Sequence, residues 1–170
     1  MQYRAAPAED SGLADKSVDL VSVAQALHWF DRARFFREVQ RVARPGALIA
    51  LYGTDWFYIT PSLDAMTDLW LLKPIQTFWL PYNRLLWDGY RTIDFPFEEI
   101  APPHLAIHLT WTLDQVFDYY LTWSAPRRKI TADGDSFITA ARYAMETAWG
   151  DQMRQRHIVM PMSVRLGKVA

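Results

Sequence analysis

The hydrophobic and polar positions in the first third of the chain fall into three blocks. Residues 18–24, "VDLVSVA", form a short apolar run, which predicts a strand buried on both faces, as in a parallel sheet. Residues 32–43 repeat apolar side chains at helical spacing, and Asp31 before them is a suitable N-cap. A Pro-Gly pair then ends the helix, and residues 47–51 predict a second buried strand. Strand, helix and strand at this spacing predict a βαβ unit.

The middle and the end of the chain are patterned differently. Residues 53–103 are rich in aromatic side chains and prolines, which favours short helices in a cap or insertion. Period-two alternation predicts a strand, half buried on one face, over residues 105–111. The remaining expected elements are a short strand at residues 2–4, helices at 112–122 (with Thr112 as N-cap) and 134–149, and a last strand at 158–166, which Pro161 places at an edge or a bulge.

Composition excludes several classes of function. The 170 residues suit one domain, and a net charge of −1 creates no field that would attract nucleic acid. Cysteine is absent, so the sequence predicts neither disulfides nor a thiolate nucleophile. His104 and His108 lie four apart on a predicted strand without further ligands, so we expect no metal site. Charges and prolines interrupt the most apolar stretch, residues 69–87, and no signal peptide is evident, so we expect a cytoplasmic protein without membrane contact.

Several motifs resemble one enzyme family. "SVDLVSVAQALHWFD" and "FFREVQRVARPGALIALYG" are similar to the middle of class I S-adenosylmethionine-dependent methyltransferases, in the methyltransferase type 11 branch that includes trans-aconitate methyltransferase-like enzymes. "YRTIDFPFEEI", "WTLDQVFDYYLTWSA" and "MPMSVRLGK" resemble the C-terminal part of the same branch. The resemblance implies a Rossmann-like α/β sheet, S-adenosyl-L-methionine as cofactor, and methyl transfer to a small molecule such as a carboxylic acid.

One departure from the family pattern changes this expectation. The seven glycines are isolated, so the Gly-rich turn that the family uses at the cofactor is missing. By resemblance, residues 1–170 form the C-terminal part of one methyltransferase domain, truncated at the N-terminus by two strand-helix units. The strand at 18–24 would then have an open apolar edge, available to a partner chain or to self-association. We therefore expect the chain alone to bind the cofactor weakly or not at all. The alternative to an enzyme is an inactive fragment or split-enzyme subunit acting as an interaction module.

The same resemblance assigns candidate site residues. It places five on the cofactor side: Ala8, Glu9, Gln25, Ala26 and His28. Position at the carboxyl end of a parallel strand also favours the ligand side for the last three, because ligands bind there in open α/β sheets. For Glu9, a solvated loop carboxylate is an equally good interpretation. For His28, the alternative is a histidine that caps the strand.

Three aromatic residues are candidate substrate contacts. They are Trp29, Tyr52 and Trp123, and for each the alternative is packing in a hydrophobic core. No catalytic residue is assigned. Methyl transfer to a carboxylate oxygen requires alignment of the reacting atoms and no proton removal.

Overall fold

The computed structural model describes residues 3–170. The chain divides into two compact units. Unit 1 comprises Met1–Asp55, Tyr82–Leu105 and Met162–Ala170, and unit 2 comprises Trp56–Pro81 and Ala106–Pro161. The expected insertion at residues 53–103 shares residues 56–81 with unit 2, and its boundaries stay a prediction.

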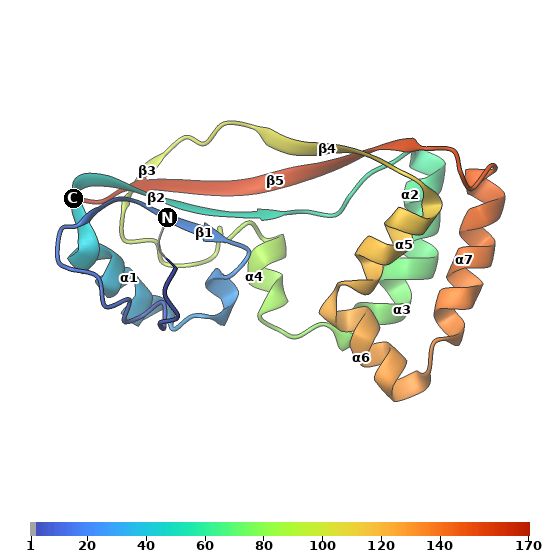
Figure 1. Ribbon diagram of the computed structural model, residues 1–170, viewed down its shortest axis with the longest axis horizontal. Helices are drawn as coiled ribbons and strands as arrows, with labels where there is room; N and C mark the ends of the chain where they lie inside the picture. Colours follow the sequence, from blue (N-terminus) through green and yellow to red (C-terminus); the bar gives the residue numbers. More distant parts are fainter. Residues whose placement is uncertain (1–2) are drawn as a thin grey trace. The chain divides into compact units, whose positions relative to one another are not determined.

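Unit 1 contains the βαβ unit that the sequence predicts. Strand β1 (Val18–Ala24) pairs in parallel with β2 (Ala43–Thr54), and helix α1 (Arg32–Val42) connects them (Figure 1). The Asp31 carboxylate accepts a hydrogen bond from the Arg34 amide, which confirms the predicted N-cap. Strand β2 begins directly after the helix and includes the Pro-Gly pair, whose glycine at φ 81° adopts a left-handed conformation.

The sheet is mixed and has the order β1-β2-β5-β3. Strand β5 (Arg156–Lys168) runs antiparallel to β2 and to β3 (Glu98–Ile100), and β4 (Leu105–Trp111) also pairs with β5. An edge position for the last strand is therefore wrong. Pro161 is tolerated because the ladder with β2 extends only to the pair Thr54↔Met162, so its missing N–H costs no bond in that ladder.

Other expectations about strands also fail. Strand β1 is not buried on both faces: Val23 is its one buried residue, and the Leu20 side chain is 55% exposed. The reason is that, among the described residues, β1 has a neighbour only on the β2 side. Residues 3–4 form no strand, and residue 2 lies outside the described part of the chain. Strand β4 is mostly exposed instead of half buried.

The core of unit 1 lies between α1 and the sheet. The apolar face of α1 packs on strand residues, and the segment after the short helix α4 (Asn83–Trp87) completes the cluster. Its fully covered members include Leu27, Val39, Ile49, Leu51 and Tyr90. Burial of such side chains stabilises a fold by about 1.5–3 kcal/mol each. This packing fixes the carboxyl ends of β1 and β2, where ligands bind in open sheets.

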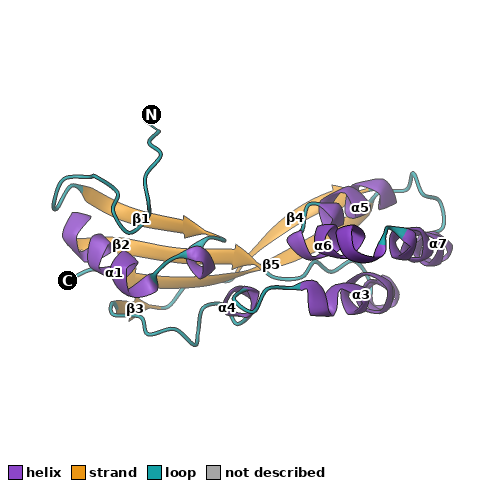
Figure 2. Ribbon diagram, turned by 90° about the horizontal axis from the view of Figure 1, so that it is seen from below, coloured by secondary structure: helices purple, strands orange, loops and turns teal. Residues whose placement is uncertain are grey.

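Unit 2 is mainly helical, as Figure 2 shows in purple. Its helices are α2 (Pro61–Thr67), η2 (Asp68–Leu72), α3 (Lys73–Ile75), η3 (Gln76–Phe78), α5 (Leu113–Leu121), α6 (Ser124–Asp133) and α7 (Ser136–Trp149). Short helices at 53–103 and the Thr112 cap of α5 are confirmed, the latter as a full capping box with Gln115. Helix α6 was not predicted. Within the described residues, no helix has the length and apolar character needed to cross a membrane.

Candidate functional site

The predicted cofactor and substrate residues of unit 1 gather around the end of β1. Strand β1 ends at Ala24, and the 3-10 helix η1 (Leu27–Trp29) follows it before α1 begins. Between them, Gln25 has φ 50°, a left-handed conformation that is uncommon for a residue with a side chain. After this turn, η1 contacts α4, and the rings of His28 and Trp29 lie against Tyr82, the N-cap residue of α4.

Gln25 is held by two hydrogen bonds to β2. Its backbone N–H donates to the Tyr52 carbonyl over 2.8 Å, and its Nε2 donates to Thr54 Oγ1 over 2.9 Å. Tyr52 is half buried, and its hydroxyl lies 3.0 Å from Ser22 Oγ. Gln25 and Tyr52 therefore lie together at the carboxyl ends of the two parallel strands.

His28 is the buried polar residue of this group. Its side chain is 8% exposed, and its ring lies 5.2 Å from the Trp29 ring and 5.7 Å from the Tyr82 ring, centroid to centroid. Burial lowers the pKa of His28 below its usual value, so the imidazole is neutral at neutral pH. Trp29, in contrast, is 62% exposed, and its ring packs against the Tyr82 ring with a centroid distance of 4.6 Å.

Ala8 and Glu9 lie in the N-terminal loop that precedes β1. Glu9 accepts a hydrogen bond from the Asp31 backbone N–H through Oε1, over 2.8 Å, so it ties the N-terminal loop to the start of α1. Ala8 and Ala26 both line a hollow of about 370 Å³ beside β1. Most of its lining is apolar and comes from β1 and α1, including Leu20, Val23 and Val39.

The residues around this hollow fit the adenosine portion of S-adenosylmethionine. Apolar walls at Ala8 and Ala26 suit a flat aromatic ring. Glu9 follows Ala8 in the chain but does not line the hollow, and its carboxylate binds the Asp31 backbone N–H. The described residues of the hollow offer no cationic side chain for the cofactor's carboxylate.

Trp123 does not belong to this group, because it lies in unit 2. Its half-buried ring is part of an aromatic cluster, 5.5 Å from Trp56, 6.0 Å from Trp79 and 5.6 Å from Tyr119. The rings contact one another at these distances.

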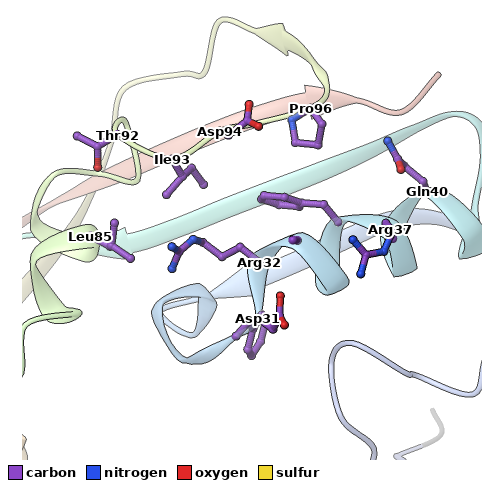
Figure 3. A pocket seen from close by; sticks show the side chains of 12 residues that line it. Asp31, Arg32, Arg37, Gln40, Leu85, Thr92, Ile93, Asp94 and Pro96 are labelled. Carbon is purple, nitrogen blue, oxygen red and sulfur yellow. The ribbon is translucent and has the colours of Figure 1, made fainter.

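A second hollow of unit 1, of about 600 Å³, lies between α1 and the segment at residues 92–96 (Figure 3). Phe36 and Ile93 form apolar parts of its lining, and Arg32, Arg37 and Asp94 add charges of both signs. Asp31, which also lines it, makes the formal charge of the lining zero, so the hollow has no evident preference for an anion or a cation. Sequence patterns gave no signal for it.

Metal chemistry has no support from the described residues. No three His, Cys, Asp or Glu side chains in that part of the chain lie close enough together to hold an ion. His108 pairs with His157 on β5, with 3.1 Å between Nδ1 and Nε2, and not with His104.

The known proteins that resemble this chain are methyltransferases. A family model described as a methyltransferase domain matches residues 1–51. A solved structure from Anaeromyxobacter dehalogenans, described as a candidate type II methyltransferase, is 37% identical and superposes with a TM-score of 0.92, over 99% of this chain and 72% of that chain. The chain belongs to the class I S-adenosylmethionine-dependent methyltransferase family. The Rossmann-like fold class expected from the sequence is thereby confirmed.

Curated methyltransferases match more distantly. A candidate methyltransferase of Dictyostelium discoideum is 28% identical over 127 residues, which are 73% of this chain and 48% of that relative. A Saccharomyces cerevisiae protein named as an S-adenosylmethionine-dependent methyltransferase is 40% identical over 58 residues, 34% of this chain and 19% of its own length. This methyltransferase-family chain therefore spans about half the length of the Dictyostelium relative.

Proposed function

We propose that this chain takes part in the transfer of a methyl group from S-adenosylmethionine to a small molecule, and that the acceptor is an oxygen of a carboxylic acid. The observation that supports this most is the position of Gln25, His28 and Trp29. They follow the carboxyl end of β1, beside a parallel strand, in a chain whose family transfers methyl groups.

The residues of unit 1 divide into two roles in this proposal. Ala8, Glu9, Gln25, Ala26 and His28 hold the cofactor, while Trp29 and Tyr52 contact the acceptor. When bound, S-adenosylmethionine supplies an electrophilic methyl group on a sulfonium sulfur. The rings of Trp29 and Tyr82 pack beside His28, with their centroids 4.6 Å apart. Trp123 remains a proposed acceptor contact whose role a substitution tests separately.

The acceptor's chemistry decides what the protein must supply. A carboxylate is already ionised at neutral pH, so the chain has to align it, and no general base is needed. The neutral His28 suits such a site because it adds no positive charge next to a sulfonium.

Radiolabelled S-adenosylmethionine with trans-aconitate as the probe acid tests the proposal. We expect label in a base-labile methyl ester, and a loss of about tenfold or more in kcat/KM for His28→Ala. His104→Ala, which changes an exposed histidine outside the site, is the control. Absence of base-labile label at millimolar cofactor would overturn methyl transfer to a carboxylate by this chain.

A second candidate function, an interaction module, has one observation in its favour. Strand β1 pairs only with β2 among the described residues, and Leu20 is exposed beside the apolar hollow. Unpaired N–H and C=O groups along such a strand are a template for another strand. We propose that this edge pairs with a second chain, either another protein or a copy of itself.

The module is tested by the molar mass in solution. Light scattering after size exclusion should show association that Leu20→Lys abolishes, because a charge at the centre of an edge strand opposes pairing. Tyr143→Lys, at an exposed aromatic residue of α7, is the matched control. A monomeric wild-type chain would argue against self-association.

A further inference from the structure

Gln25 contacts three consecutive residues at the end of β2. Its backbone N–H donates to the Tyr52 carbonyl over 2.8 Å, and its side-chain Nε2 donates to Thr54 Oγ1 over 2.9 Å. Gly53 lies between these two partners, and a Cβ there would come within 3.3 Å of Gln25 Cγ. A side chain at residue 53 would therefore press against the side chain of Gln25, and glycine leaves that space open.

The same glycine allows α4 to approach β2. A Cβ at residue 53 would overlap Leu86 Cδ1, which belongs to α4. Helix α4 has Tyr82 as its N-cap residue, and the Tyr82 ring stacks on the His28 ring at 5.7 Å. Gly53 thus lets both Gln25 and α4 pack closely on the end of β2, beside the residues that follow β1.

Gln25 needs partners that hold it in place. Its φ of 50° is costly for a residue with a side chain and persists only where the surrounding structure fixes it. The residue is also exposed, and an exposed glutamine side chain without a partner exchanges among its rotamers. The Tyr52 carbonyl holds the backbone turn, and the Thr54 hydroxyl holds the side-chain amide.

We propose that Thr54 is a positioning residue whose hydroxyl holds the Gln25 amide in the orientation that binds S-adenosylmethionine. This inference rests on the proposed function, which places Gln25 on the cofactor side. Thr54 occupies one N–H of the amide, and the described residues make no further hydrogen bond to it. The amide oxygen and the second N–H are therefore available to a polar group of the cofactor.

The contribution of Thr54 is to order Gln25 before the cofactor binds. Immobilising one flexible side chain during binding weakens affinity by about two- to tenfold. Because the hydroxyl of Thr54 already immobilises the amide, its removal adds this cost to the binding step. Thr54→Val removes the hydroxyl and keeps the branched shape that suits a strand.

An NMR titration of the full chain with S-adenosylhomocysteine measures this effect. We expect Thr54→Val to raise the dissociation constant about two- to tenfold, and Thr54→Ser to restore it because serine supplies the hydroxyl. Adding Thr54→Val to Gln25→Ala should weaken binding no further, because Thr54 acts through Gln25. Thr131→Val is the matched control: the Thr131 hydroxyl donates to the Arg127 carbonyl over 3.0 Å in unit 2, so the dissociation constant should not change.

Nuclear relaxation of the Gln25 side-chain amide, without any ligand, gives an independent result. Thr54→Val should make this amide mobile on the picosecond-to-nanosecond timescale and change the melting temperature little, because the lost hydrogen bond is exposed. The inference is overturned if the amide stays equally ordered, if Thr54→Val leaves the dissociation constant unchanged, if Thr54→Ser does not restore it, or if the wild-type chain binds no S-adenosylhomocysteine. Binding that depends on Thr54, without methyl transfer to the acid, would refute the proposed function alone and support this inference.

Discussion

Glu38 anchors the N-terminal loop to α1, and its replacement by Gln should destabilise unit 1. Its Oε1 accepts from the Ser11 backbone N–H at 2.9 Å, from Ser11 Oγ at 2.5 Å and from Arg41 at 2.8 Å. Its Oε2 accepts from Arg41 Nε at 2.9 Å. Glu38→Gln keeps the size of the side chain but removes its charge; with the amide oxygen still facing Ser11, its N–H group is turned toward Arg41.

The magnitude follows from these contacts. A hydrogen bond to a charged group contributes about 1.5–3 kcal/mol. The Arg41 side chain is 38% exposed, so solvent weakens its two contacts with Glu38, while the bonds to Ser11 persist with a neutral acceptor. We expect the free energy of unfolding to fall by about 2 kcal/mol, or the melting temperature by about 4–8 °C for a chain of this size.

The effect should disappear in acid. The contacts with Arg41 and Ser11 lower the pKa of Glu38 to about 2, from 4.5. A carboxylate whose pKa is lowered by folding stabilises the fold fully when the pH is above its pKa in the unfolded state. This contribution is lost as the pH falls through its pKa in the folded state. The difference between wild type and Glu38→Gln should thus be complete at pH 7 and shrink between about pH 4.5 and 2.

Urea unfolding followed by circular dichroism, with hydrogen exchange of α1 amides, measures both effects. Glu146→Gln is the control, because Glu146 contacts Arg142 at 3.3 Å on the surface of α7 and should change stability by less than about 0.5 kcal/mol. A Glu38→Gln effect below about 0.5 kcal/mol at pH 7, or one that persists at pH 2, would refute this reasoning.

Three further predictions concern stability. Thr112→Ala should destabilise α5 by about 1 kcal/mol in urea unfolding. Asp135→Ala at α7 should have little effect, because the Asp135 side chain makes no capping hydrogen bond, and equal losses of stability in the two variants would contradict the role of the Thr112 cap. Gly167→Ala should lower the unfolding free energy by about 1–3 kcal/mol, since its Cβ would lie 2.7 Å from Phe95 Cε1, and an unchanged melting temperature would show that the ring moves freely. Burial raises the pKa of Tyr90 to about 12, so the contribution of its neutral hydroxyl to the free energy of unfolding is complete below pH 10 and lost toward pH 12. Raising the pH from 10 to 12 should therefore destabilise Tyr90→Phe less than wild type, and identical changes in melting temperature would contradict this.

Local signals in the sequence predict much of unit 1. Asp31 before an amphipathic repeat identifies α1, and the apolar run after the Pro-Gly pair identifies β2. The exposure of β1 is not predictable in this way, because an apolar strand looks the same whether or not a neighbour covers its second edge. Helix α6 is not predicted from the sequence, because its apolar residues follow no clear helical period. Pro126 is by itself a helix-breaking signal, although the structure places it in the first turn of α6, where proline is tolerated.

The site is only partly predictable for the same physical reason. Gln25 and His28 follow from their position after a parallel strand, which is a local property of the chain. Tyr82 lies more than fifty residues away, just before the short helix α4, and only the folded chain brings its ring to His28 and Trp29 in η1.

The central claim is that the β1 side of unit 1 holds S-adenosylmethionine. The most direct measurement is an NMR titration of the labelled chain with S-adenosylhomocysteine, the demethylated cofactor. Because the hollow beside β1 is open on one side, we predict weak binding, with a dissociation constant of about 0.1–1 mM, and shifts confined to residues 8–9 and 22–29. The absence of any shift at roughly 5 mM S-adenosylhomocysteine, about five times the upper limit of that range, would contradict the account, as would shifts centred on unit 2.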